Sequence, residues 1–186
     1  MSLPASQKRI LNSFNPLFCV LFVIALVLLR TFLESLGWSW VDRWDVLLAF
    51  AIYIGQRRSL VEGLIVTLFV SHVLALNAVA PMGVLVTHYV ILFLGAHALG
   101  GVLYASSRLS VLTMLFVFAI LSRFLYPILA SMLGQSWPMW SWYNLSLFYI
   151  LLNALVGWLI YMLLISLDRW TYKDLEGGVA LSGDRL

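Results

Sequence analysis

The sequence predicts an all-α protein, a polytopic membrane bundle of six transmembrane helices with both termini in the cytoplasm. The first observation is composition: of 186 residues, 63% are hydrophobic and 10% are charged, and the mean hydropathy is +1.00. No soluble domain of this size needs so much apolar surface. The second is that the apolar runs are continuous, whereas strands of an outer-membrane barrel alternate over about ten residues.

Three regions follow from the hydropathy pattern. We expect a cytoplasmic N-terminal lead at 1–15, a transmembrane domain at 16–167 and a flexible cytoplasmic tail at 168–186. The first apolar run is too long for the core of a signal peptide, which indicates a retained span. The six expected spans cover residues 16–36, 46–55, 60–76, 84–105, 111–133 and 144–167.

The second and third apolar runs are short, which leaves two interpretations. They form either two short tilted spans or one re-entrant hairpin that returns to the same face. Arg57 and Arg58 lie between the two runs, and each arginine at mid-membrane costs about 2.5 to 3.5 kcal/mol on insertion scales. The charges therefore favour two spans joined by a cytoplasmic Arg-Arg connection.

Charge distribution is the third observation and sets the orientation. With a cytoplasmic N-terminus, one side carries eight basic residues and the other carries only Arg43, so the positive-inside rule puts both termini in the cytoplasm. Tryptophans cluster on the expected outer side, at positions 38, 40 and 44 and again at 137, 140 and 142. The basic residues of the inner side are Lys8, Arg9, Arg57, Arg58, Arg108, Arg169, Lys173 and Arg185.

Ionisable residues within spans are costly in a bilayer and are therefore candidates for function. Most of them here fall in the outer half of their spans. Two interpretations stay open: these charges lock helices together or reach the outer headgroups, or they line a polar pocket open to the outside. The residues of this intramembrane polar layer are Arg30, Glu34, Asp45, His72, His88 and Arg123.

Spacing suggests partners for several of these charges. Arg30 and Glu34 stand one helical turn apart, so we expect them to pair locally. Arg123 has no acidic residue within its own span, and we name Asp45 as its expected partner from another helix. These pairings would be the contacts that lock the outer layer.

Structural roles explain the histidines and Glu62. His72 and His88 are single imidazoles on different spans without recognisable ligand spacing, so we expect hydrogen-bonded core histidines and no metal site. Glu62 follows Arg58 by four residues, and pairing at the cytoplasmic interface explains it without proton chemistry.

Small residues indicate where helices approach closely. Gly63, Thr67 and Ser71 recur every four residues along the third span, and Ala96 with Gly100 form a similar pair on the fourth. Such seams allow close helix packing in membranes. We expect them to hold the protein's own bundle together, with a homodimer contact as the alternative.

Known chemical motifs do not occur in this sequence. It contains no nucleophile elbow, P-loop, HExxH sequence or glycine-rich nucleotide fingerprint, and no basic patch with interleaved aromatics for nucleic acid. We therefore expect a non-enzymatic protein with no cofactor, which contacts membrane lipid. An intramembrane enzyme is a third hypothesis, after the two given next.

The architecture and the turn Ala80-Pro81-Met82-Gly83 resemble the rod shape-determining protein MreD family over roughly residues 45–133. That family has short middle helices and a small-Pro-hydrophobic-Gly turn after the third, which adds Pro81 and Gly83 to the packing or partner-contact candidates. Where the family often has a glycine and, four residues later, an aspartate, this chain has Ser71 and Ala75. The role of that aspartate therefore does not transfer.

The resemblance implies a multi-pass protein of the bacterial inner (cytoplasmic) membrane that is a component of the cell-elongation machinery. Its partners would be a membrane-anchored MreC-like protein, the complex of a SEDS glycosyltransferase with a penicillin-binding protein, and MreB filaments. The alternative is a substrate-binding membrane subunit of an energy-coupling-factor transporter. Such a subunit would use Asp45, His72, His88 and Arg123 to hold a small polar ligand in an outward-facing pocket.

Overall fold

A computed structural model describes residues 5–38, 44–76, 78, 81–100, 108–134 and 147–171, with backbone alone at 5–10 and 108. All regular structure in these ranges is helical, which confirms the predicted all-α class. The six helices are α1 (Ala5–Ser35), α2 (Val46–Arg57), α3 (Leu60–Leu76), α4 (Met82–Gly100), α5 (Arg108–Met132) and α6 (Leu147–Trp170).

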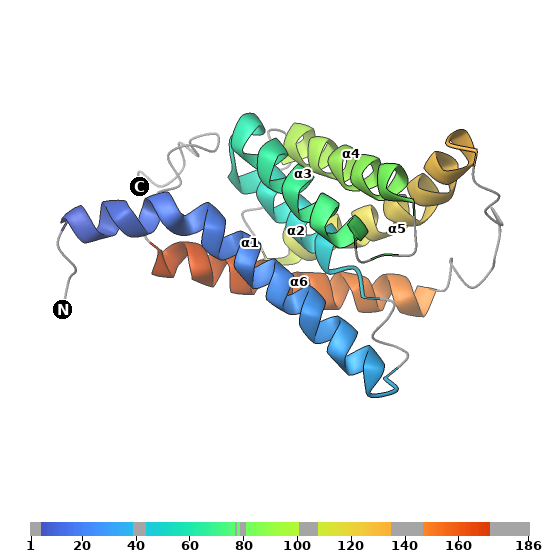
Figure 1. Cartoon of the computed structure of the whole chain (residues 1–186), viewed down its shortest axis with the longest axis horizontal. Helices are drawn as coiled ribbons and strands as arrows, with labels where there is room; N and C mark the ends of the chain where they lie inside the picture. Colours follow the sequence, from blue (N-terminus) through green and yellow to red (C-terminus); the bar gives the residue numbers. More distant parts are fainter. Residues whose placement is uncertain are drawn as a thin grey trace.

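Consecutive helices run in opposite directions along the long axis of the molecule (Figure 1). The start of α1, the connection between α2 and α3, and the end of α6 therefore lie at one end of the bundle, on the left of Figure 1. We call this the inner end, following the orientation that the basic residues predict, and the opposite end the outer end.

Helix length divides the bundle into two groups. Four helices are long and apolar enough to cross a membrane: α1 from Leu11 onward, α4, α5 and α6. The two others are shorter, and the 12 residues of α2 extend only about 18 Å at 1.5 Å per residue, against a hydrocarbon core of about 30 Å. The fold is a helical bundle with four helices that could span a membrane, and α2 falls furthest short of the thickness of the bilayer.

The short helix α2 is the centre of the core. Every residue from Val46 to Gly55 is buried, and α2 lies behind α3 and between α4 and α6 in Figure 1. Close approach to α4 requires the glycine: a Cβ on Gly55 would lie 2.8 Å from the carbonyl oxygen of Phe93 and 2.9 Å from the Cβ of Ala96.

Three helices extend beyond the predicted spans. α1 begins at Ala5, so most of the expected polar lead is helical. α4 begins at Met82, with the Pro81 carbonyl accepting the N–H of Val84 at 3.0 Å, so Gly83 belongs to the first helical turn; Ala80 lies outside the described residues. α6 continues to Trp170, three residues into the expected tail, and the remainder at 172–186 also lies outside the description.

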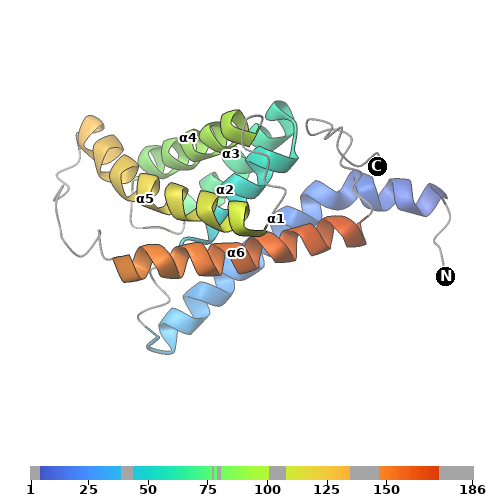
Figure 2. The same cartoon turned by 180° about the vertical axis from the view of Figure 1, so that it is seen from behind.

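Of the four long helices, α1 is the least embedded. Only 17% of its most apolar window is buried, against 39%, 33% and 39% for α4, α5 and α6. It crosses α6 obliquely, and its outer third lies apart from α6 in both views (Figures 1 and 2). Leu21, Leu28 and Phe32 on this helix are each about half exposed or more.

Candidate functional site

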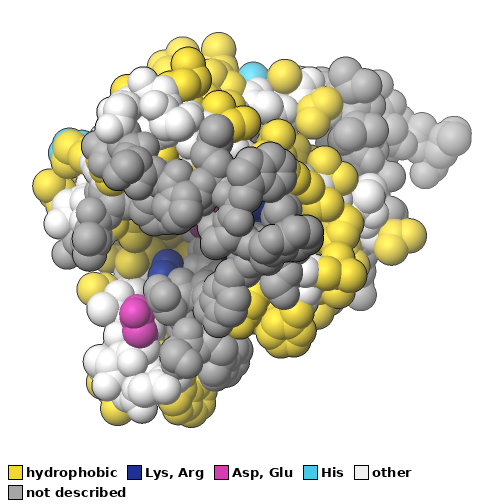
Figure 3. All heavy atoms as spheres, turned by 90° about the vertical axis from the view of Figure 1, so that its right-hand side faces the viewer, with side chains coloured by type: hydrophobic (Ala, Val, Ile, Leu, Met, Phe, Trp, Pro, Cys, Tyr) yellow, Lys and Arg dark blue, Asp and Glu magenta, His cyan; other side chains and the backbone are white. Residues whose placement is uncertain are grey.

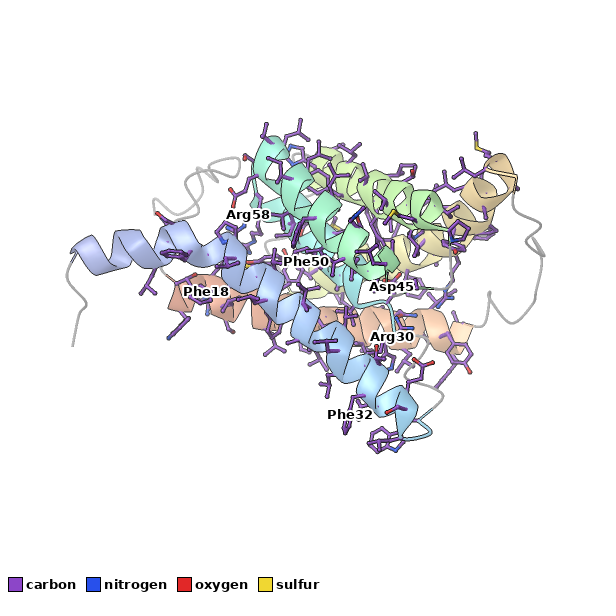
Figure 4. The ribbon with its side chains drawn as sticks, viewed as in Figure 1. Phe18, Arg30, Phe32, Asp45, Phe50 and Arg58 are labelled. Atoms are coloured by element: carbon purple, nitrogen blue, oxygen red, sulfur yellow. The ribbon has the colours of Figure 1, made fainter. Side chains whose placement is uncertain are left out.

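Two buried polar clusters lie at the two ends of α2. Figure 4 shows Asp45 and Arg58 at opposite ends of this helix, with Phe50 between them. Each cluster is named after the end of the bundle at which it lies. The outer cluster comprises Asp45, His88, Tyr89, Ser122 and Asn153, and the inner cluster comprises Asn15, Tyr53, Arg58, Asp168 and Thr171.

A short helix needs such clusters because its terminal N–H and C=O groups have no partners within the helix. Lipid offers none, so protein groups must supply them. At the outer end the Asp45 carboxylate accepts the N–H of Leu48 at 3.0 Å and places a negative charge at the positive end of the helix dipole. At the inner end Nδ1–H of His97 donates to the Gly55 carbonyl at 2.9 Å.

The outer cluster ties α2 to α4 and α6. Tyr89 donates its hydroxyl proton to Asp45 at 2.9 Å, and the backbone N–H of Asp45 donates to the Asn153 side chain at 2.7 Å. Asn153 in turn donates to the Tyr149 carbonyl within α6. The start of α2 is therefore fixed by one helix on each side.

A serine and a histidine form the second half of the outer cluster. His88 Nε2 lies 3.0 Å from Ser122 Oγ, and the imidazole packs edge-on against Tyr89 and Tyr126. Such a pair is the start of a nucleophile–base arrangement, which also needs a third group that orients the base. His88 Nδ1 is buried without a hydrogen-bond partner among the described residues. The pair links α4 to α5, and nothing described completes a catalytic set.

Arg58 is the centre of the inner cluster. Its Nη2 lies 2.5 Å from Asp168 Oδ1 and 2.6 Å from Asn15 Oδ1, while Asn15 Nδ2 donates to Asp168 at 2.8 Å. Tyr53 donates its hydroxyl proton to the second carboxylate oxygen, and Thr171 Oγ1 accepts from Asn15 at 2.5 Å. Arg58 is 3% exposed and Asp168 is 5% exposed, so this is a buried ion pair.

Electrostatics at Arg58 favour the charged form. Burial alone lowers the pKa of a guanidinium, but the adjacent Asp168 carboxylate raises it, and the net pKa of Arg58 is shifted upward. The expected pairing with Glu62 is present only as a long contact, with Nε 3.8 Å from Oε1. The main partner of Arg58 is Asp168, and its side chain points into the bundle instead of into the headgroup layer.

The expected pairings of the outer charges are not formed. Between Arg30 and Glu34, both of which the structure describes, there is no ion pair, and Glu34 is exposed. Asp45 directs its carboxylate to Leu48 and Tyr89, and not to Arg123. Figure 3 looks onto the outer end, where acidic and basic side chains lie among hydrophobic ones.

The two histidines of the outer layer differ from each other. His88 is a hydrogen-bonded core histidine, 2% exposed. His72 is exposed on α3 and has no hydrogen bond to a described residue, so the expectation of a core histidine was wrong there. No hydrogen bond or ion pair between described groups joins any two of Asp45, His72, His88 and Arg123.

Packing seams occupy the interior of the bundle. Gly63, Thr67 and Ser71 are buried on α3, and a Cβ on Gly63 would lie 2.5 Å from the ring of Phe93 in α4. Ala96 is fully buried against Gly55, and the Cβ position of Gly100 lies 3.6 Å from Gln56. Gly83 differs, because it faces open space.

Sequence reasoning missed most of the inner cluster. Asn15 and Asp168 lie in the expected lead and tail. No role was predicted for Tyr53 or Thr171. One signal was present: an aspartate in the last turn of a helix opposes the helix dipole, so a buried Asp168 requires a nearby cation. Its partner lies 110 positions away, beyond the reach of local spacing.

Fold and site define a polytopic helical membrane protein built around a capped core helix. Comparison with protein-family models, with curated proteins and with solved structures gave no match.

Proposed function

We propose that this chain is a non-enzymatic inner-membrane component of the bacterial cell-elongation machinery. The observation that carries the proposal is the short middle pair: α2 has 12 residues and α3 has 17, between longer helices. Short middle helices followed by a proline-glycine sequence are the features by which the chain resembles the MreD family. The start of α4 at Met82 places Gly83 inside a helix and leaves Pro81 directly before it.

The proposed mode of action is helix packing. The described polar groups of the interior are mostly engaged with one another, while large apolar side chains point outward from α1 and α3, including Leu28, Phe32, Ile65 and Phe69. Lipid covers such surfaces, and a membrane anchor of a partner can replace it. A MreC-like protein and the synthase complex of a SEDS glycosyltransferase and a penicillin-binding protein are the proposed partners, with MreB filaments on the cytoplasmic side.

The transporter alternative receives less support. It requires Asp45, His72, His88 and Arg123 to converge on one ligand. His72 is exposed on α3 while His88 is buried between α4 and α5. Binding of a small polar ligand by these four residues together is therefore not favoured.

Purification from native membranes tests the proposal. The tagged full chain is extracted in mild detergent from the membranes of the cells that encode it, beside an equally expressed, tagged membrane protein of similar size. We expect a MreC-like protein and cell-wall synthases to be enriched with the chain alone, and its depletion to round the cells. Normal rods after depletion and equal recovery with both baits would contradict the proposal. A small polar ligand that raises thermal stability would favour the transporter alternative.

A further inference from the structure

We infer that the inner cluster is a latch that holds α1 against the other five helices, with Arg58 as its movable part. The inference concerns a conformational change within the bundle and does not depend on the proposed function. It rests on how α1 is buried, on the two carboxylates around Arg58, and on the position of Cys19.

α1 is attached mainly through its inner half. Between residues 11 and 35, where the side chains of this helix are described, the buried residues are Asn15, Cys19, Val20 and Val23. They form one face at helical spacing, and Asn15 carries the described polar contacts to α6. Between residues 28 and 36 every side chain is exposed or half-buried. The attachment of α1 is therefore concentrated where the inner cluster lies.

Arg58 lies between carboxylates from two different helices. Asp168 of α6 accepts from Nη2 at 2.5 Å, whereas Glu62 of α3 lies 3.8 Å from Nε, and Nε has no hydrogen-bond partner among the described residues. An arginine removed from its only carboxylate would be left as a buried, unpaired charge, which is strongly unfavourable. Here a turn of the guanidinium toward Glu62 keeps the charge paired.

Two arrangements of the same residues follow from this geometry. In the closed arrangement, which the structure shows, Arg58 binds both Asn15 of α1 and Asp168 of α6 and ties these two helices to the connection between α2 and α3. In the open arrangement Arg58 pairs with Glu62, and Asn15 loses its contact with Arg58. α1 then separates from the connection between α2 and α3, while the core around α2 is unchanged.

Cys19 is a natural reporter of this opening. It is the single cysteine of the chain and is fully buried. Its sulfur lies 3.8 Å from Arg58 Nη2 and 3.7 Å from Asn15 Oδ1. Any separation of α1 from Arg58 exposes this thiol.

The experiment measures the labelling rate of Cys19 by N-ethylmaleimide in the purified full chain in detergent, read by mass spectrometry. We expect slow labelling of the wild type and acceleration of about ten-fold or more in D168N, because weakening the closed state raises the population of the open one. E62Q, which removes the second carboxylate, should slow labelling below the wild-type rate. The matched control D45N alters an aspartate of the outer cluster and should label at the wild-type rate.

A second reporter separates a latch from general loosening. In a C19S background, A119C places a thiol at a buried position of α5, and D168N should leave its labelling unchanged. Wild-type labelling of Cys19 in folded D168N, or equal acceleration at both reporters, would overturn the inference. If D168N does not elute as a single species, N15A decides by the same criteria, because it leaves the Arg58–Asp168 pair intact.

Discussion

Arg58 and Asp168 form a buried ion pair at the centre of the inner cluster. Asp168 lies in the last turn of α6, where a negative charge opposes the helix dipole, and the guanidinium of Arg58 compensates it. Asn15 and Tyr53 also donate to the Asp168 carboxylate, and Thr171 Oγ1 accepts a hydrogen bond from Asn15. A carboxylate with this many donors is stable in a buried site only as a complete set.

Removing one member of the pair should therefore be costly. We expect D168N to lower the free energy of unfolding by about 1–3 kcal/mol, because Arg58 loses a charged hydrogen-bond partner but can turn toward Glu62. R58Q should cost more, about 3–5 kcal/mol, because Asp168 is left as a buried charge without a described cation. The double variant should cost less than the sum of the two. Reversible denaturation in mixed micelles measures all three. Single variants within about 0.5 kcal/mol of the wild type would show that the pair contributes little.

The two outer-layer histidines give a matched comparison. His88 is buried on Ser122, so H88L leaves a buried hydroxyl without this partner and should cost about 1–3 kcal/mol. His72 is exposed, and H72L should change stability by no more than about 0.5 kcal/mol. The same denaturation measurement compares them. Equal losses would mean that His72 is not exposed as described.

At the scale of elements, close contact between α2 and α4 is the defining feature. Gly55 approaches backbone atoms of α4, Gly63 approaches a phenylalanine ring, and Gly83 faces open space within the first turn of α4. Three glycines of one bundle thus occupy three different environments. Spacing along the sequence does not separate them, because it does not show which atoms of the next helix lie opposite.

Alanine at these three glycines should rank their environments. G55A should destabilise by about 1–3 kcal/mol through overpacking, since the opposing atoms belong to backbone that cannot move aside. G63A should cost less, because the opposing ring of Phe93 can shift. G83A should be neutral or stabilise by up to about 1 kcal/mol, because alanine favours a helix. A G83A loss as large as that of G55A would contradict the assignment of Gly83 to a helix.

Much of the helical layout was predictable because hydropathy depends on neighbours in sequence. The bounds of α3 agree at both ends, and α2, α5 and α6 begin or end within three residues of expectation. Contacts between distant charges were not predictable in the same way. Arg58 was assigned to Glu62 and Arg123 to Asp45 from spacing and charge, whereas burial and the crossing of α1 over α6 decide the actual partners.

At the scale of the whole molecule, the bundle encloses a helix too short to reach both headgroup layers. Four long apolar helices and α3 surround α2, and its ends are satisfied by the outer and inner clusters. Irregular backbone at membrane depth is tolerated where protein surrounds it. In the proposed role in cell elongation, partners bind the outer surface of this bundle, while the polar clusters stabilise its interior.

Partner binding should not depend on the serine–histidine pair. If helix packing carries the function, H88L and S122A proteins that still fold should recover the MreC-like partner at the wild-type level, because the serine–histidine pair is buried between α4 and α5. Quantitative mass spectrometry of the purified complex measures the recovery. Loss of in-cell function with unchanged partner recovery and stability would instead favour chemistry at this pair.

Cysteine scanning of α2 and α3 tests most directly whether α2 is a core helix that is buried on all its faces. Single cysteines at 46–54 and 60–76 in a C19S background are labelled with a small maleimide in the purified protein in detergent, at a pH at which an accessible thiol ionises. α3 should label in a helical stripe, with Val61, Ile65, Leu68, Phe69 and His72 reactive and Thr67, Val70 and Ser71 protected. α2 should be protected at every position, because all its faces are buried. A helical stripe of labelling along α2 would contradict the account of a buried core helix.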